Sequence, residues 1–317
     1  MPILTVDKLS IKENSKLNRV VVQEITFTLE KGEILGIVGE SGSGKTVTAL
    51  SILNLLPKDL EILTGKICFQ KRNLKDFSEK EWEKIRGKEI SMIFQNPISS
   101  LNPLIKAGNQ IVEIIKNHSE LSKSQCIERA FQVLKDVGFE NPEEIFYKYP
   151  HQLSGGQGQR VGIAMAIANN PKILIADEPT TALDTESQNQ VLNILKEIQK
   201  KYNTSIIIIS HDLGIIKKFT DKAIVMYYGE IVEIQKTESL FALPKHPYTK
   251  GLLDSLPENF KKGEPIKAMI GAIPSIDDKI EGCFFSPRCP KVLEKCKKNK
   301  ISLEKNINGA IRCINQY

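Results

Sequence analysis

Hydrophobic residues in the first forty positions occur in short runs with the spacing of β-strands. Ile25, Phe27 and Leu29 alternate with polar residues, which is typical of a strand with one buried face. Residues 34–38 are almost continuously apolar, which is typical of a strand buried on both faces. A glycine-rich loop follows, and the pattern then predicts a helix over residues 46–55. A strand, a glycine-rich loop and a helix in this order are typical of a nucleotide-binding α/β unit.

The spacing changes between about residues 96 and 168, where apolar residues recur every three or four positions, as on one face of a helix. Strand-like runs return at 173–175, 205–209 and 223–226, and a helical pattern at 188–200 connects the first two. Alternating strands and helices imply a largely parallel sheet with right-handed crossovers. We therefore predict an α/β fold in which the block at 96–168 is a helical insertion.

Proline residues divide the last part of the chain. From residue 236 onward, seven prolines interrupt every candidate element, which favours loops over long helices or strands. We expect a nucleotide-binding domain over residues 1–240, containing the helical insertion, and a loop-rich C-terminal extension over residues 241–317.

The composition, with 41% hydrophobic and 26% charged residues, is that of an ordinary globular protein. No apolar run approaches the roughly 18 residues that span a bilayer. The first residues lack the basic segment and apolar segment of a secretory signal. We therefore expect a soluble cytoplasmic chain, whose role at a membrane would depend on its partners.

Charge is distributed unevenly along the chain. Lysine and arginine total 44 and aspartate and glutamate 38, and the excess lies from Lys236 onward, where 15 basic residues accompany 9 acidic ones. A domain that binds nucleic acid usually has a basic main body, and here the main body is neutral. We expect no nucleic-acid partner, and we interpret the basic tail as a solvated surface.

One segment carries a specific phosphate-binding pattern. It fits G-x-x-x-x-G-K-[ST] and lies between a predicted strand and a predicted helix, and its residues are Gly39, Glu40, Ser41, Gly42, Ser43, Gly44, Lys45 and Thr46. Backbone N–H groups of such a loop point at the oxygens of a polyphosphate. Lys45 would neutralise the β and γ phosphates of ATP, and the Thr46 hydroxyl would bind Mg²⁺.

Two carboxylates follow the apolar run at 173–175. Ligands of open parallel sheets bind outside the carboxyl ends of the strands, so Asp177 and Glu178 should emerge beside the phosphate loop. We expect Asp177 to hold Mg²⁺ and Glu178 to polarise the attacking water as the catalytic base.

A third motif, Leu153-Ser154-Gly155-Gly156-Gln157, opens a predicted helix that runs to about residue 168, with Ser154 as its N-cap. A phosphate loop, this motif and a strand that ends in Asp-Glu, in this order, resemble the nucleotide-binding subunits of ABC transporters. The resemblance covers residues 1 to about 240. It implies a P-loop NTPase fold of the ABC type and ATP hydrolysis with Mg²⁺.

The resemblance also implies roles for three further residues. Gln95 is similar to the glutamine that contacts ATP and Mg²⁺, so the implied Mg²⁺ ligands are Thr46, Gln95 and Asp177. Asp184, in Ala182-Leu183-Asp184, is similar to the D-loop aspartate at the dimer interface. His211 is similar to the catalytic histidine that contacts the γ-phosphate. The family usually stacks adenine on an aromatic residue, but residues 5–22 contain none, and Ile11, Arg19 or Val20 would take its place.

In this family two subunits hold ATP between them. The third motif of one subunit caps the ATP that is held by the phosphate loop of the other, so Ser154, Gly155, Gly156 and Gln157 are expected to contact a partner's nucleotide. Hydrolysis would then open the interface and drive a conformational change.

Two segments of the tail, at 246–253 and 282–290, resemble the C-terminal extension of oligopeptide and dipeptide permease ATPases. The resemblance implies an importer of peptides, or alternatively of nickel or a metal chelate. It also implies a second homologous ATPase in a heterodimer, two membrane-spanning permeases, an extracytoplasmic binding protein and a place on the cytoplasmic face of the membrane. A non-transport ABC ATPase is disfavoured, because such chains usually carry two cassettes or a long coiled coil.

Four of the six cysteines lie in the extension, with the spacing C-x₅-C-x₆-C-x₁₆-C: Cys283, Cys289, Cys296 and Cys313. A late cluster of four in a cytosolic chain suggests a metal site more than two disulfides. Four thiolates suit a [4Fe–4S] cluster or Zn²⁺, and free thiols are the third alternative. The resemblance favours the iron–sulfur cluster.

Overall fold

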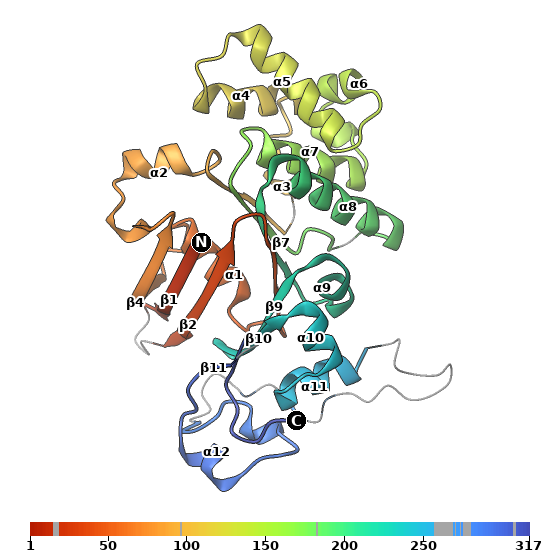
Figure 1. The fold of residues 1–317 in the computed structure, drawn as a ribbon. Coiled ribbons are helices and arrows are strands. Elements are labelled where there is room, and N and C mark those ends of the chain that lie inside the picture. Colours follow the sequence, from red (N-terminus) through yellow and green to blue (C-terminus); the bar gives the residue numbers. More distant parts are fainter. Residues whose placement is uncertain are drawn as a thin grey trace.

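The structure is a computed structural model that describes residues 1–14, 19–95, 97–181, 183–256, 269, 271–272, 274, 280–306 and 309–317. Two sheets and a group of helices form its layers (Figure 1). The larger sheet has eight strands in the order β11-β12-β10-β9-β3-β8-β7-β6. The smaller sheet has four strands in the order β2-β1-β4-β5.

The centre of the larger sheet is parallel, as predicted. Its five parallel strands are β3 (Ile34–Val38), β6 (Ile90–Ile93), β7 (Ile173–Asp177), β8 (Ser205–Ser210) and β9 (Lys222–Tyr227). Every residue of β3 is buried, and Ile37 lies between Ile209 of β8 and Ile224 of β9. The continuous apolar runs therefore form strands that are covered on both faces.

The smaller sheet is antiparallel and was predicted only in its first two strands. It consists of β1 (Pro2–Glu13), β2 (Val20–Glu30), β4 (Leu60–Phe69) and β5 (Arg72–Asn73), with η1 (Leu74–Asp76) and α2 (Glu79–Ile85) after them. Its inner face shares one hydrophobic cluster with the larger sheet, and Val6 and Ile25 belong to that cluster with Ile175. This shared core fixes the smaller sheet beside β3, the strand that leads to the glycine-rich loop.

The helix after that loop, α1 (Lys45–Ile52), is shorter than predicted. The sequence pattern places its end at Leu55, but Asn54 has a φ of 52°. A residue in the left-handed region cannot continue a right-handed helix. The apolar residues up to Leu55 extended the pattern beyond the true helix end.

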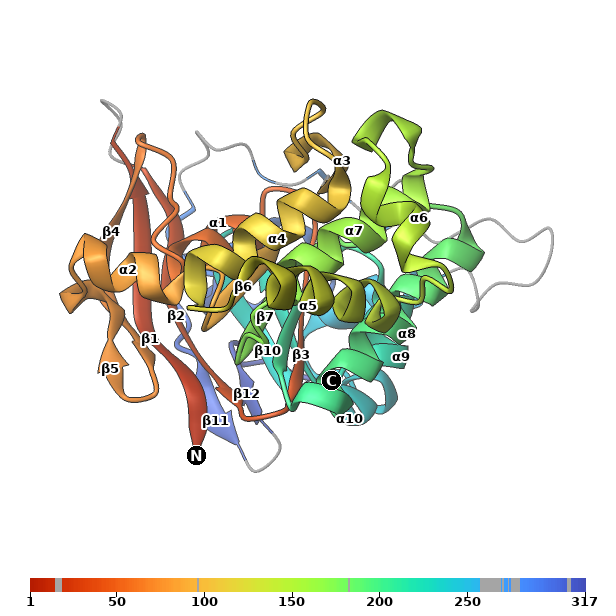
Figure 2. The same ribbon diagram turned by 90° about the horizontal axis from the view of Figure 1, so that it is seen from above.

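The helical block contains α3 (Pro97–Ser100), α4 (Ala107–His118), α5 (Lys123–Asp136), α6 (Pro142–Tyr147), η2 (Pro150–Gln152) and α7 (Gly155–Ile167). In Figures 1 and 2 these segments gather at one end of the molecule, above β6 and β7. Ile111, Leu134 and Val161, from three of the helices, pack in one cluster with Leu174 of β7. Two more helices, α8 (Thr185–Tyr202) and α9 (Leu213–Phe219), follow β7 and β8.

The C-terminal extension is built onto the larger sheet, which its proline content did not predict. After β10 (Glu230–Lys236), the described part of the chain contains α10 (Thr237–Ala242), α11 (Pro247–Asp254), η4 (Ser286–Arg288), α12 (Glu294–Lys298), β11 (Glu304–Asn306) and β12 (Gly309–Ile311). Strand β12 pairs antiparallel with β10, where Ala310 lies opposite Ile234. Tyr248 and Phe285 pack with Tyr227 of β9 in a third hydrophobic cluster.

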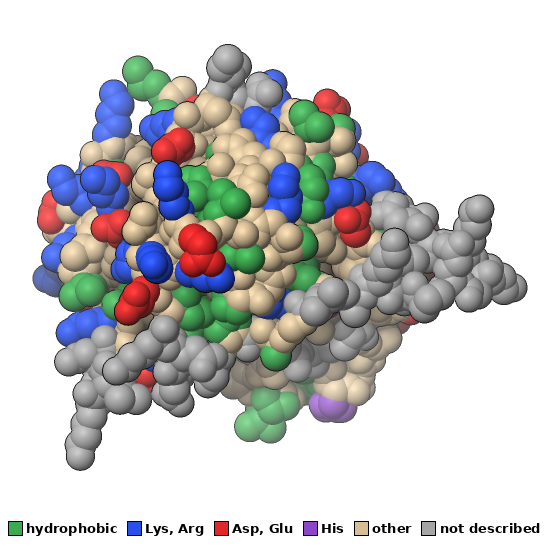
Figure 3. Space-filling model, turned by 90° about the horizontal axis from the view of Figure 1, so that it is seen from below, with side chains coloured by type: hydrophobic (Ala, Val, Ile, Leu, Met, Phe, Trp, Pro, Cys, Tyr) green, Lys and Arg blue, Asp and Glu red, His purple; other side chains and the backbone are tan. Residues whose placement is uncertain are grey.

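Among the described residues, no helix is both long enough and apolar enough to cross a membrane. The face shown in Figure 3 carries lysine and arginine side chains that alternate with aspartate and glutamate.

Glu230 of β10 predicts a pH dependence of stability. Burial raises the pKa of Glu230 to about 6, although Arg312 and Lys300 act in the opposite direction. The folded state therefore binds the proton more tightly than the unfolded state, so stability falls as the pH rises from about 4.5 to 6 and stays lower above that range. Ionised Glu230 costs about 2 kcal/mol at pH 7. We expect Glu230→Gln to raise the urea midpoint at pH 7 and to have little effect at pH 4.5.

The matched control is Glu197→Gln, because the Glu197 side chain is 73% exposed. Glu197→Gln should change the urea midpoint little at either pH 4.5 or pH 7. A Glu230→Gln variant whose difference from the wild type is the same at pH 4.5 and pH 7 would contradict the assignment.

Candidate functional site

The glycine-rich loop joins β3 to α1 and leaves no room for side chains at its first glycine. A Cβ atom at Gly39 would lie 2.1 Å from the carbonyl oxygen of Met226. Gly44 is the N-cap of α1 and has a φ of 95°, which favours glycine. The loop therefore passes close to β9 and turns directly into the helix, so its backbone N–H groups lie at a helix N-terminus.

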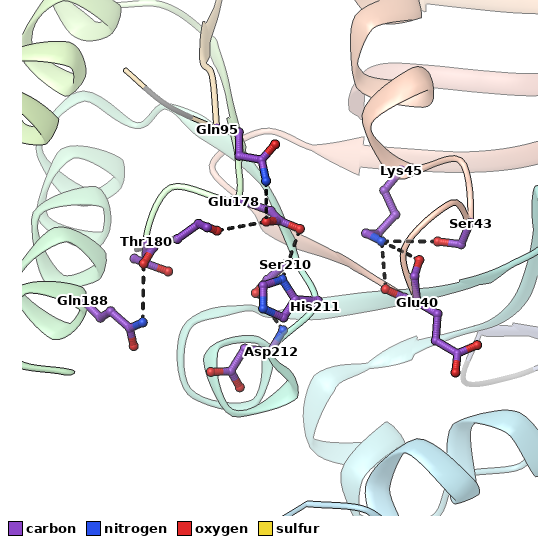
Figure 4. A network of polar contacts seen from close by, with 12 residues as sticks. Glu40, Ser43, Lys45, Gln95, Glu178, Thr180, Gln188, Ser210, His211 and Asp212 are labelled. Carbon is purple, nitrogen blue, oxygen red and sulfur yellow. Dashed lines mark hydrogen bonds and ion pairs between the residues drawn. The ribbon is translucent and has the colours of Figure 1, made fainter. Parts of the chain in front are cut away.

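Lys45 lies inside the curve of this loop and is almost fully buried. Its ammonium donates to the carbonyl oxygens of Gly39 and Glu40, each at 2.8 Å, and to Ser43 Oγ at 3.4 Å (Figure 4). Burial lowers the pKa of Lys45, while the carboxylates of Glu178 and Asp177 act in the opposite direction. The positively charged Lys45 ammonium is thus held where the sequence predicts the phosphates of a nucleotide.

Asp177 ends β7 and faces Thr46, the first-turn residue of α1. The Thr46 side chain is hydrogen-bonded to the Asp177 carboxylate, and burial raises the pKa of Asp177. Its Oδ1 atom is buried and has no hydrogen-bond partner among the described residues. A buried carboxylate oxygen without a partner is costly unless a cation or water satisfies it. Because hard oxygen ligands suit Mg²⁺, Thr46 and Asp177 fit the predicted ion.

Glu178 is the centre of a polar network (Figure 4). Its Oε2 accepts hydrogen bonds from Gln95 Nε2 at 3.0 Å and Thr181 Oγ1 at 2.9 Å, and His211 Nδ1 lies 3.1 Å from its Oε1. Burial would raise the pKa of Glu178, but the hydrogen bonds from His211 and Thr181 outweigh burial and lower it. Glu178 is therefore ionised at neutral pH and can accept a hydrogen bond from water.

Three neighbouring parallel strands position this network. Gln95 follows β6, Glu178 follows β7 and His211 follows β8, so all three side chains emerge at the carboxyl edge of the sheet. The arrangement can orient a water molecule beside the phosphate loop. The resemblance implies that His211 contacts the γ-phosphate, and here its Nδ1 contacts Glu178 instead.

The motif at 153–157 lies at a separate place. Ser154 is the N-cap of α7, as predicted, and its hydroxyl accepts a hydrogen bond from Gln157 N at 3.3 Å. A cavity of about 330 Å³ opens beside it and joins the motif to the start of α8, where Asp184 accepts hydrogen bonds from Glu186 N and Ser187 N. A Cβ atom at Gly155 would have no neighbour within 4 Å.

The predicted site residues thus fall into two groups. The phosphate loop, Gln95, Asp177, Glu178 and His211 form one group, joined by hydrogen bonds and charge interactions. Ser154, Gly155, Gly156, Gln157 and Asp184 line the cavity, which includes no residue of the first group. The predicted site residues of one chain therefore form two separate groups.

Sequence reasoning missed several residues of these two groups. Thr181 contacts Glu178, and its hydroxyl lies three residues after that carboxylate, a local signal that was available. Arg160 and Ser187 line the cavity beside the third motif. Ile11 is fully buried in the core and cannot stack on a base, whereas Arg19 and Val20 are half-buried. Residue 182 of the predicted D-loop lies outside the described residues.

The four cysteines of the extension gather but form no metal site. Cys283 interacts electrostatically with Cys289 and Cys296, and Cys313 does so with the same two residues. Burial raises the pKa of Cys283 to about 12. Among the described residues, no group of three or more His, Cys, Asp or Glu residues could hold a metal ion. The structure thus gives the predicted iron–sulfur cluster and the zinc alternative no support.

Comparisons with known families and proteins agree with this geometry. The profile of the family described as ABC transporter matches residues 22–181, and that of the oligopeptide/dipeptide transporter C-terminal region matches residues 232–296. The oligopeptide transport ATP-binding protein AppD of Bacillus subtilis is 46% identical, over 92% of this chain and 90% of its own. The dipeptide transport ATP-binding protein DppD of Escherichia coli is 43% identical, over 98% and 95%.

Solved structures show the same fold. The ATP-binding cassette MJ0796, in a dimeric post-hydrolysis state with ADP and phosphate, matches with a TM-score of 0.66 and 27% identity, over 74% of this chain and 98% of its own. The cbiO1 subunit of the cbiONQ transporter complex of Clostridium perfringens matches with a TM-score of 0.67 and 29% identity, over 76% and 91%. The α/β architecture predicted from the sequence is therefore confirmed.

Proposed function

The chain belongs to the ABC transporter family, in its oligopeptide and dipeptide branch, and from this premise we propose how its residues perform the work of the family. The protein is an ATPase that couples ATP hydrolysis to import, and its relatives are named for the transport of oligopeptides and dipeptides. We assign oligopeptides or dipeptides as its cargo.

Glu178 is the proposed catalytic base, and its place in the polar network carries the assignment. An ionised carboxylate at the end of a central strand, beside Lys45 and Asp177, can accept a hydrogen bond from the water that attacks the γ-phosphate. Gln95 and His211 hold this carboxylate from two sides. Their role before ATP binds is to fix its direction, and His211 is free to turn toward the γ-phosphate afterwards.

The phosphate loop is the proposed ATP site. Lys45 now bonds to carbonyl oxygens of its own loop, and incoming phosphate oxygens would replace those acceptors. The loop N–H groups at the start of α1 would face the same oxygens. We assign Thr46, Gln95 and Asp177 as the residues that hold Mg²⁺. When bound, this ion neutralises charge on the β and γ phosphates.

The second group of site residues is proposed to be a half-site that binds the ATP held by a partner subunit. Ser154 and the N–H groups of Gly155 and Gly156 lie at the N-terminus of α7, which has thirteen residues and no acidic residue in its first turn. This end of a helix favours an anion. A homologous ATPase subunit, bound head to tail, would place its own nucleotide there. The related cassette MJ0796 is dimeric in its solved structure, which supports a paired arrangement.

A substitution at Gly155 tests this second half-site. Because a side chain at Gly155 meets nothing within 4 Å in this chain, Gly155→Glu should fold normally and bind ATP at its own phosphate loop. The added carboxylate would repel the partner's γ-phosphate. We expect ATP hydrolysis by the assembled complex to fall about 100-fold, a size typical of removing stabilisation of developing charge. Unchanged hydrolysis in the complex would refute the assignment.

The proposed assembly contains a second ATPase, two membrane permeases and an extracytoplasmic binding protein. We place the subunit at the cytoplasmic face of the membrane, where the permeases hold it. The family match supports a membrane transporter as its partner. Purification of the tagged chain from membranes, followed by ATPase assays with peptide-loaded binding protein, tests the proposal. Peptide-stimulated hydrolysis with co-purified permeases would support it, and hydrolysis that is independent of permeases and peptide would overturn it.

We assign no metal centre to the four cysteines of the extension. The [4Fe–4S] cluster and the zinc alternative are tested by visible absorption and metal analysis of anaerobically purified protein. A brown protein with stoichiometric iron and sulfide would establish the cluster, and a metal-free colourless protein would exclude both metals.

A further inference from the structure

The C-terminal extension contacts the phosphate loop directly. Arg288, the last residue of η4, donates from Nη1 to Glu40 Oε2 at 2.7 Å and from Nη2 to Glu40 Oε1 at 3.0 Å. These two parallel bonds form the bidentate geometry that is strongest between arginine and a carboxylate. Glu40 is the second residue of the phosphate loop, so a residue from the last tenth of the chain is bonded to the ATP site.

The same residue of the loop is held at its backbone. The Glu40 N–H donates to the hydroxyl oxygen of Tyr248, on α11, at 3.0 Å. Tyr248 packs against Tyr227, whose hydroxyl lies 3.4 Å from Arg288 Nη1, and Phe285 contacts both rings. The extension therefore holds both the carboxylate and the amide of Glu40.

The arginine of this ion pair is buried and the glutamate is half-buried. The Arg288 side chain is 4% exposed and the Glu40 side chain 26% exposed. Arg288 Nε is buried and has no hydrogen-bond partner among the described residues. Burying a guanidinium with one unsatisfied donor is a poor way to gain stability. The pair is better explained by its effect on the charge and conformation of the phosphate loop.

Glu40 is a negative charge in a loop that binds a polyphosphate. Its carbonyl oxygen accepts a hydrogen bond from Lys45, and Figure 4 shows its carboxylate directed away from that ammonium. A free carboxylate at this position would repel the phosphates of ATP, because charges interact strongly where water is partly excluded. Arg288 both neutralises this carboxylate and keeps it turned away.

We propose that Arg288 is a positioning residue for ATP binding: through Glu40, the C-terminal extension sets the shape and charge of the phosphate loop. Loosening of the extension would then weaken ATP binding without any change in the residues that contact the nucleotide. The inference rests on the proposed function of the loop as the ATP site.

The variant Arg288→Met tests the proposal, with Arg312→Met as its matched control. Both arginines precede a cysteine of the extension and both are buried, with whole-residue exposures of 9% for Arg288 and 8% for Arg312. Arg312 instead bonds to the carbonyl oxygens of Ile231 and Ile301, away from the phosphate loop. Titration with a fluorescent ATP analogue gives the dissociation constant of each full-length variant, and thermal unfolding shows that it is folded.

We expect Arg288→Met to raise the dissociation constant and the KM for ATP about tenfold, equivalent to about 1.4 kcal/mol, while kcat of the assembled complex changes less than about twofold. Arg312→Met should leave the dissociation constant unchanged. The double variant Arg288→Met/Glu40→Gln should recover affinity, because it removes the negative charge that Arg288 no longer neutralises. A merely structural role for Arg288 predicts no such recovery.

Wild-type affinity in Arg288→Met would overturn the proposal, as would a loss that Glu40→Gln does not repair. If Arg288→Met fails to fold, Arg288→Lys replaces it, since lysine keeps the charge but loses the bidentate geometry. Its affinity should lie between those of the wild type and the tenfold-weakened variant, and wild-type affinity would again overturn the proposal. Failure of the wild-type chain itself to bind ATP would contradict the proposed function, so the two failures are distinguishable.

Discussion

Glu178→Gln is expected to lower ATP hydrolysis by the assembled complex at least about 100-fold, which is the usual contribution of a general base. Glutamine has the same shape as glutamate and keeps one oxygen that can accept hydrogen bonds from Gln95 and Thr181. It loses the negative charge that polarises water. Because the phosphate loop is unchanged, ATP should still bind with an affinity close to that of the wild type.

The measurement is phosphate release by the complex, together with the amount of ATP retained per subunit. Glu197→Gln, on the exposed face of α8, is the control for the loss of one negative charge and should hydrolyse ATP like the wild type. Phosphate release by Glu178→Gln at the wild-type rate would show that another group is the base.

Lys45→Met is expected to raise the dissociation constant for ATP about 100-fold or more, because a partly desolvated ammonium contributes strongly to phosphate binding. Methionine keeps much of the length and apolar character of the lysine side chain. The carbonyl oxygens of Gly39 and Glu40 lose a shared donor, and the bond to Gly39 is buried, so we expect a local loss of stability at the loop while the two sheets keep their contacts. The fold should therefore persist while nucleotide binding is lost.

The control is Lys31→Met, in the exposed turn before β3. It removes one positive charge at the other end of the same strand and should bind ATP like the wild type. A dissociation constant for Lys45→Met within threefold of the wild type would contradict the role of Lys45.

The parallel sheet and the phosphate loop were predictable because their signals are local. A strand buried on both faces is a continuous apolar run, as at Ile34–Val38, and the loop motif follows it directly. The ends of parallel strands meet at one edge of the sheet, so the gathering of Asp177, Glu178 and His211 also followed from the sequence. The helix end at Ile52 was not predictable from periodicity, because the conformation of Asn54 decides it.

The remaining features depend on contacts between distant segments. Pairing of β12 with β10 and the bond between Arg288 and Glu40 leave no periodic pattern in the sequence. The cysteine spacing predicted that the four residues gather, but the number of thiols that can share one metal depends on side-chain directions that spacing does not set. The resemblance implies that a partner's ATP binds beside Ser154. In this chain that place is an open cavity, because the partner would supply the rest of the site.

The most direct test of the account is the molar mass of the Glu178→Gln subunit mixed with its homologous ATPase partner, measured by light scattering with and without ATP. We expect the two subunits to associate when Mg²⁺ and ATP are added and to separate when ATP is removed, and we expect Gly155→Glu to prevent this association. Subunits that stay apart at saturating ATP, or that associate equally well with Gly155→Glu, would contradict the claim that each chain contributes half of a shared nucleotide site.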